Sequence, residues 1–164
     1  MYKLISKDEI KNLKEEAKLA VLGRARICLH SSHSHLTQES VICALNDNYF
    51  RPHKHPSDIS ESYCIIEGQM QIDFFDDAGK WSERITLGEV GSQYPFLYRL
   101  NQSTYHWVRP ISDVLVYHEV LTGPWEKQRI VSYANFSPKE SDENGIVDFN
   151  NLYKLESTVK NETT

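Results

Sequence analysis

The sequence has no surplus of basic residues and no long apolar run. Its 18 lysines and arginines are outnumbered by 23 aspartates and glutamates, which gives a formal net charge of −5. Because nucleic-acid binding needs a basic surface that neutralises phosphates, this charge argues against nucleic acid as the main partner. No apolar stretch approaches the roughly 20 residues of a membrane span, and the N-terminus lacks the apolar core of a secretion signal. We therefore expect a cytoplasmic protein whose partners include neither nucleic acid nor a membrane.

Cysteine is also scarce, since the chain has only Cys28, Cys43 and Cys64. None belongs to a Cys-x-x-Cys pair, which argues against a zinc–thiolate site. Without a secretion signal, we expect all three thiols to be reduced. The 164 residues, 40% hydrophobic and 25% charged, have the size and composition of one globular domain.

The chain begins with a predicted helix and continues as short strands. Ser6 and Glu9 form a capping box, and Ile10, Leu13 and Ala17 repeat at helical spacing, which predicts a helix over residues 7–21. We expect this helix to pack on its own domain or on a partner subunit. Apolar segments separated by turn residues then predict eight strands, at residues 41–46, 49–55, 61–67, 69–75, 81–87, 91–100, 104–109 and 114–121.

Many short strands at regular spacing predict an all-β sandwich or barrel, and eight strands closing on themselves make a jelly roll. We divide the chain into three parts. Residues 1–39 form the N-terminal helix and an extended arm, and residues 40–125 form the barrel. Residues 126–164 form a C-terminal extension that packs on the barrel and ends in a polar, frayed tail.

Three polar residues near the middle of the chain predict a metal site. His53 and His55 are two positions apart, so both imidazoles face the same side of a strand. Glu61 begins the next apolar run, and a turn between the strands would bring its carboxylate opposite the histidines. Gly68 then permits a tight hairpin turn. His106 lies in a later strand-like segment and can supply a third imidazole. We predict one divalent transition metal held by His53, His55, Glu61 and His106, and this ligand set does not distinguish iron, manganese, nickel, zinc or cobalt.

The spacing of these residues resembles the first cupin motif, in which His-x-His is followed by Glu and, seven positions later, by Gly. His106 resembles the last position of the second cupin motif. This resemblance implies a cupin fold, that is, a double-stranded β-helix or jelly-roll barrel, here preceded by an N-terminal α-helix. It also implies a homodimer.

A further resemblance covers most of residues 24–140. The chain resembles the WbuC-type cupin-fold metalloproteins in several short segments that occur in the same order. These segments are Arg24 and Arg26 with His30, residues 51–55, 75–79 and 104–106, Glu119 with Gly123 and Pro124, and residues 136–140. Genes of that family are often found among bacterial surface-polysaccharide (O-antigen) genes. The resemblance therefore implies a link to polysaccharide biosynthesis.

Four residues beyond the ligands are candidates for the site. Tyr63 shares strand parity with Glu61, so it can transfer a proton as a catalytic residue, although a core tyrosine would show the same pattern. Arg51 shares parity with the two histidines and is our first choice for binding a substrate phosphate or carboxylate; the alternative is a surface salt bridge. The resemblance adds Arg26 and His30 as substrate-binding residues.

These observations favour a small metal-dependent enzyme. We expect it to bind a small phosphorylated or carboxylated molecule and to isomerise or epimerise a sugar or nucleotide-sugar intermediate of O-antigen biosynthesis. The link to polysaccharides comes only from the family resemblance. The alternatives are an iron-dependent dioxygenase, a non-catalytic cupin that binds a small ligand, and a cupin that has lost its metal.

Overall fold

The structure, a computed structural model, describes residues 2–46 and 48–161. Its strands are β1 (Arg24–Cys28), β2 (Thr37–Leu45), β3 (His53–Lys54), β4 (Glu61–Glu67), β5 (Gln69–Phe75), β6 (Trp81–Gly88), β7 (Leu97–Leu100), β8 (Tyr105–Pro110), β9 (Val114–Thr122) and β10 (Ser132–Tyr133). Its helices are α1 (Lys7–Leu19), α2 (Lys127–Ile130) and α3 (Glu143–Asn161). No helix in the described ranges is long and apolar enough to cross a lipid bilayer.

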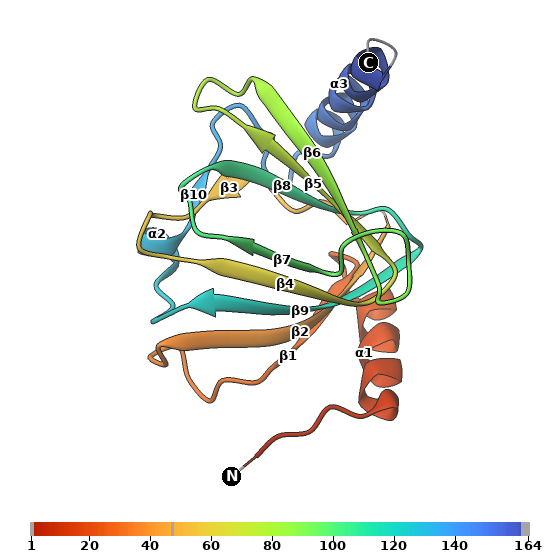
Figure 1. Cartoon of the computed structure of the whole chain (residues 1–164), viewed down its shortest axis with the longest axis vertical. Helices are drawn as coiled ribbons and strands as arrows, with labels where there is room; N and C mark the ends of the chain where they lie inside the picture. Colours follow the sequence, from red (N-terminus) through yellow and green to blue (C-terminus); the bar gives the residue numbers. More distant parts are fainter. Residues whose placement is uncertain (1, 47, 162–164) are drawn as a thin grey trace.

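Two antiparallel sheets of five strands each face one another (Figure 1). One sheet has the strand order β1-β2-β9-β4-β7, and the other has the order β10-β3-β8-β5-β6. Consecutive strands such as β4 and β5 therefore lie in different sheets, and the chain passes from one sheet to the other. This arrangement is the cupin double-stranded β-helix, which confirms the predicted fold class.

The turn between β4 and β5 depends on glycine. Gly68 has a φ of +83°, in the left-handed region that residues with a side chain avoid. A Cβ at this position would also collide with the carbonyl oxygen of Val114 and the hydroxyl of Ser112. The turn fixes the point where the chain leaves one sheet and enters the other.

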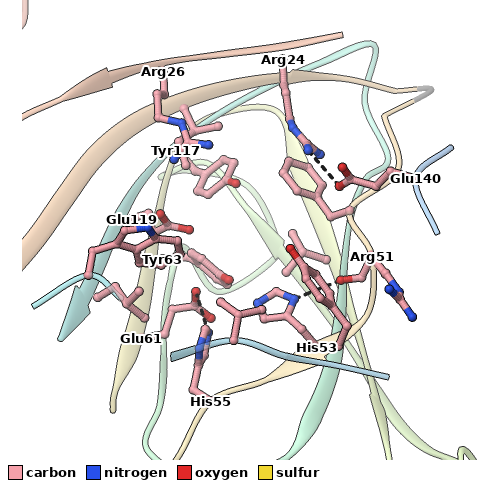
Figure 2. A pocket seen from close by; sticks show the side chains of 17 residues that line it. Arg24, Arg26, Arg51, His53, His55, Glu61, Tyr63, Tyr117, Glu119 and Glu140 are labelled. Atoms are coloured by element: carbon pink, nitrogen blue, oxygen red, sulfur yellow. Dashed lines mark hydrogen bonds and ion pairs between the residues drawn. The ribbon is translucent and has the colours of Figure 1, made fainter. Parts of the chain in front are cut away.

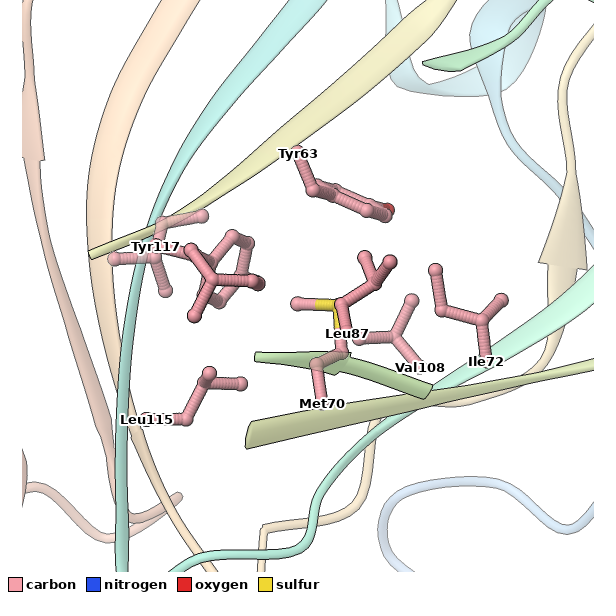
Figure 3. Close-up of a cluster of buried hydrophobic side chains, with 9 residues drawn as sticks. Tyr63, Met70, Ile72, Leu87, Val108, Leu115 and Tyr117 are labelled. Carbon is pink, nitrogen blue, oxygen red and sulfur yellow. The ribbon is translucent and has the colours of Figure 1, made fainter. Parts of the chain in front are cut away.

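Apolar side chains from both sheets fill the space between them (Figure 3). The buried members of this core are Ile42, Tyr63, Ile65, Met70, Ile72, Leu87, Val108, Leu115 and Tyr117. Burial of each large aliphatic side chain contributes about 1.5–3 kcal/mol. Because Tyr63 and Tyr117 also line the pocket described below, the core forms part of the pocket wall.

Helix α1 packs on the outer face of the first sheet. The capping box is present, with the Ser6 hydroxyl accepting from the Glu9 N–H and the Glu9 carboxylate accepting from the Ser6 N–H. Leu13 and Ala17 pack against Val41, Cys43 and Val116. The predicted helix is thus confirmed, although it ends at Leu19, and its apolar stripe lies against its own domain.

Four elements were not expected from the sequence, and one of them is the short helix α2 in the C-terminal extension. Strand β1 pairs with β2, so part of the segment assigned to an extended arm is an edge strand of the sheet. The short strand β10 pairs with β3. Helix α3 packs Phe149 and Tyr153 against Phe75 and Trp107 on the outer face of the second sheet. The frayed tail was placed after about residue 154, but α3 extends to Asn161; residues 162–164 lie outside the described part of the chain.

Candidate metal centre

The four residues predicted as metal ligands lie together between the two sheets. His53 is in β3 and is paired with His106 in β8. His55 follows β3 directly, and Glu61 is the first residue of β4 in the opposite sheet. One ligand atom from each of the four side chains lies within 4.8 Å of all the others. Figure 2 shows His53, His55 and Glu61 directed toward the same space.

The orientation of each imidazole is set by a backbone carbonyl. The Nδ1 atoms of His53, His55 and His106 lie 3.1, 2.8 and 3.1 Å from the carbonyl oxygens of Arg51, Ile130 and Thr104. A carbonyl can only accept, so each Nδ1 carries the hydrogen and donates it. Each Nε2 is then left with a free lone pair, which is the arrangement found for metal-ligating histidines.

The centre of the cluster contains polar atoms without hydrogen-bond partners. The Nε2 atoms of His55 and His106 and one carboxylate oxygen of Glu61 are buried and make no hydrogen bond. Glu61 lies 3.4 Å from His55 Nε2 and 3.2 Å from His106 Nε2, but these contacts lack hydrogen-bond geometry. Leaving such groups unpaired costs about 1–3 kcal/mol each. A shared cation would satisfy all of them at once.

The dimensions of the cluster also fit a metal ion. Bonds of about 2.1 Å place two ligand atoms of one ion at most about 4.2 Å apart. The largest separation here is 4.8 Å, so small side-chain movements would complete the coordination. Three imidazole nitrogens and one carboxylate suit first-row transition metals, and four protein ligands leave positions open on a six-coordinate ion.

The charges of the cluster depend on burial. Burial and the nearby His106 lower the pKa of His53 to about 3, so its imidazole is neutral. Burial alone would raise the pKa of Glu61, but His106 and His55 more than offset this, and the pKa lies well below its usual value. Burial would lower the pKa of His55, but the contact with Glu61 and the hydrogen bond to Ile130 more than offset this, and the pKa is raised. A metal would bind the neutral form of each imidazole and the ionised carboxylate.

A pocket of about 150 Å³ opens onto this cluster. Tyr63 and Glu119 both line it (Figure 2). Burial and then the charge of Glu61 hold the pKa of Tyr63 well above its usual value, so the phenol remains protonated and can donate a hydrogen bond. Burial and the charge of Glu61 raise the pKa of Glu119 to about 7, so this carboxyl can accept or release a proton near neutral pH.

Arg51 lines the pocket at the cluster, but its guanidinium is not directed at the ligands as its parity predicted. Its guanidinium donates to the carbonyl oxygens of Ala134 and Ser137 and lies 5.0 Å from the centre of the Tyr133 ring. Figure 2 shows it turned away from Glu61. The parity argument fails because β3 begins only at His53, so the chain at Arg51 does not alternate as a strand does.

Arg24 and Arg26 line the pocket from β1. Arg24 forms an ion pair of 2.9 Å with Glu140, and its guanidinium lies 4.6 Å from the centre of the Phe50 ring. Arg26 is exposed, and its side chain forms no ion pair or hydrogen bond with any residue that the structure describes. Arg26 was predicted to bind substrate, and the structure leaves its guanidinium available to a ligand.

His30 lies in a second pocket, of about 240 Å³, rather than beside the four candidate metal ligands. The two pockets share Arg26, Glu119, Leu121 and Trp125 in their walls. From the sequence, Glu119 was named only as part of the family resemblance and not as a site residue, and Trp125 was not named. The signal for Glu119 was present, since it shares strand parity with Tyr117 and Leu121, which also face the interior.

Solved structures share this architecture at low sequence identity. A protein of Shewanella oneidensis is 10% identical, with a TM-score of 0.57, over 79% of this chain and 85% of that chain. An oxalate oxidase in complex with the substrate analogue glycolate is 11% identical, with a TM-score of 0.51, over 75% of this chain and 61% of that chain. An RmlC-like cupin-family protein with a double-stranded β-helix fold, from Methanocaldococcus jannaschii, is 17% identical, with a TM-score of 0.47, over 76% of this chain and 91% of that chain. At these identities the likeness concerns the fold alone.

The fold and the His/Glu cluster together define a cupin with a candidate metal site. No curated protein matches the sequence. The chain belongs to the family described as "Domain of unknown function (DUF6016)", whose profile matches residues 5–87. The matched segment includes His53, His55 and Glu61 but ends before His106.

Proposed function

We propose that this protein is a mononuclear metal-dependent enzyme that acts on a small, oxygen-rich, anionic substrate. The observation that carries the proposal is the convergence of three imidazoles and one carboxylate, in which the Nε2 atoms of His55 and His106 and one oxygen of Glu61 are buried without a hydrogen-bond partner. Their hydrogen bonds to backbone carbonyls hold the imidazoles in this orientation in advance. Such preorganisation is expected of a binding site and serves no evident purpose in a packed core.

The bound ion would be held by His53, His55, Glu61 and His106 and would supply Lewis-acid chemistry to substrate oxygens. The chain's own side chains would handle protons. The phenol of Tyr63 would donate a hydrogen bond to a substrate oxygen near Glu61. The carboxyl of Glu119, with a pKa of about 7, would accept and return a proton. A neutral donor and a carboxyl that titrates near neutral pH on one pocket wall suit an isomerase or epimerase.

We infer the substrate class from a resemblance. The similarity of the chain to WbuC-type cupins favours a sugar or nucleotide-sugar intermediate in bacterial surface-polysaccharide (O-antigen) biosynthesis. Arg26, exposed and unpaired among the described residues, supports an anionic substrate. The same resemblance favours a homodimer.

The first experiment is elemental analysis of the protein, purified without a histidine tag, beside His53→Ala and Glu61→Gln variants. We expect about one equivalent of a transition metal in the parent and most of it lost from both variants. His35→Ala is the matched control, because His35 lies in a solvent-exposed loop and lines neither pocket. Full metal content in either ligand variant would remove that residue from the site, and no metal after reconstitution would refute the proposal.

Metal identity and turnover separate the alternatives. Iron together with oxygen uptake would favour a dioxygenase over an isomerase. Zinc, nickel or manganese, with interconversion of a hydroxy-carbonyl sugar followed by NMR, would favour the isomerase. Tight binding of such a sugar without any turnover would favour a non-catalytic binding cupin.

A further inference from the structure

The pocket at the His/Glu cluster is smaller than most small-molecule sites. Its volume of about 150 Å³ is below the roughly 300 Å³ at which small-molecule sites usually begin. A second pocket, of about 240 Å³, adjoins it, and Arg26, Glu119, Leu121 and Trp125 line both. A ligand that contacts the cluster and extends past Arg26 would reach the second pocket.

His30 directs a hydrogen-bond donor into this second pocket. Its Nδ1 lies 3.0 Å from the backbone nitrogen of Glu39 and 2.9 Å from the Glu39 oxygen. The Glu39 N–H can only donate, and it donates to Nδ1. In the neutral tautomer that accepts this bond, the hydrogen of the ring is on Nε2. A protonated ring also carries a hydrogen there, so His30 presents an N–H in either state.

The loop that carries His33 is held in place by other residues. The buried amide of Gln38 donates to the carbonyl oxygens of Ser32, His33 and His35 at 3.3, 3.2 and 2.8 Å. The His33 oxygen also accepts from the N–H of Trp125 at 2.7 Å. The His33 ring lies 6.2 Å from the His30 ring, measured between their centres, and lines the same pocket. The backbone that carries His33 is thus held in place, and its exposed side chain lines the pocket beside His30.

Arg26 and the two histidines give this pocket the character of an oxyanion site. A guanidinium without a protein partner among the described residues and two imidazoles surround one space, and charge-assisted hydrogen bonds from such groups favour a phosphate. The carboxyl of Glu119 lies where the two pockets join and can accept from a hydroxyl between the two ends of a ligand.

We propose that the pocket lined by Arg26, His30 and His33 binds the phosphate group of a hydroxylated substrate whose other end contacts the candidate metal site. The assignment of that other end rests on the proposed function. The phosphate subsite itself depends only on residues outside the ligand set, so it can be tested separately.

The test is calorimetric titration of the full-length, metal-loaded protein with inorganic phosphate. We expect Arg26→Gln to raise the Kd for phosphate about tenfold or more, as the loss of charge-assisted bonds implies, and His33→Ala to raise it by a smaller factor. Arg99→Gln is the matched control, because Arg99 is an exposed strand arginine that lines neither pocket. It should leave the Kd unchanged.

The metal-ligand variant His53→Ala distinguishes this subsite from the cluster. If His53→Ala binds phosphate with the parent's Kd while Arg26→Gln raises it, the subsite stands, whether or not the parent proves to contain metal. An unchanged Kd in both variants would place phosphate elsewhere and refute the subsite. If phosphate binding is lost in His53→Ala but retained in Arg26→Gln and His33→Ala, phosphate binds at the cluster and the subsite is refuted. Absence of millimolar phosphate binding to the parent would refute it as well.

Discussion

Replacement of Asp73 by asparagine should destabilise the protein strongly without affecting the candidate metal site. Asp73 is fully buried in β5, on the sheet face that packs toward α3. One of its oxygens accepts from Trp81 Nε1 at 2.8 Å and from Arg84 Nε at 2.7 Å. The other oxygen accepts from Arg109 Nη2 at 2.8 Å. The carboxylate is thus the shared partner of two arginines and an indole.

The magnitude follows from what the substitution leaves behind. The new amide side chain would be neutral, and its NH₂ group would face one of the two guanidinium groups in place of an acceptor. Removing one member of a buried charge network costs about 3–5 kcal/mol. Because the Arg84 and Arg109 side chains remain 17% and 12% exposed, some solvation is retained and we expect the lower end, about 3 kcal/mol. That corresponds to a fall of about 6–12 °C in Tm.

Urea unfolding of the parent and the variant measures this difference. Asp77→Asn is the matched control, because Asp77 also pairs with a cation, Lys54 at 2.5 Å, but is 82% exposed. Exposed pairs contribute about 0–1 kcal/mol, so the control should remain close to the parent. A loss for Asp73→Asn within about 1 kcal/mol of the control would refute the reasoning. Metal content should be the same in all three proteins.

Three further outcomes are expected. Gly68→Ala should lower the free energy of unfolding by at least about 3 kcal/mol. Gly91→Ala, at a glycine with a similar φ but open space around it, should lower it by about 1 kcal/mol. Equal losses of unfolding free energy in the two variants would contradict the collision with Val114. Glu119→Gln should raise the Tm of the metal-free protein by a few degrees at pH 8 but not at pH 4. The folded pKa of Glu119, about 7, exceeds the unfolded value, so this carboxyl favours folding only while it is protonated. A gain in Tm that persists at pH 4 would be inconsistent with this cause. Metal at about 100 times its Kd should stabilise the protein by about 2.7 kcal/mol, which a thermal scan detects as a rise in Tm. The substitution His106→Ala should abolish this rise, and a rise that survives it would exclude His106 as a ligand.

Local sequence patterns predicted much of the fold. The bounds expected for β4 and β5 are those of the structure, because each segment alternates and a glycine requiring a positive φ separates them. The capping box located the start of α1. Strand β1 and helix α3 were missed because their burial comes from contacts distant in sequence: β1 pairs with β2, and α3 covers Phe75 and Trp107.

The same division applies to the candidate site. The sequence by itself determined which residues could be metal ligands, because spacing within strands fixes the face on which a side chain lies. Only the tertiary structure decided that His53 pairs with His106, that Arg51 turns to the C-terminal extension, and that Glu119 and Trp125 join two pockets. The physical reason is that strand periodicity is local, whereas the pairing of strands and the direction of a long side chain outside a strand depend on partners far along the chain.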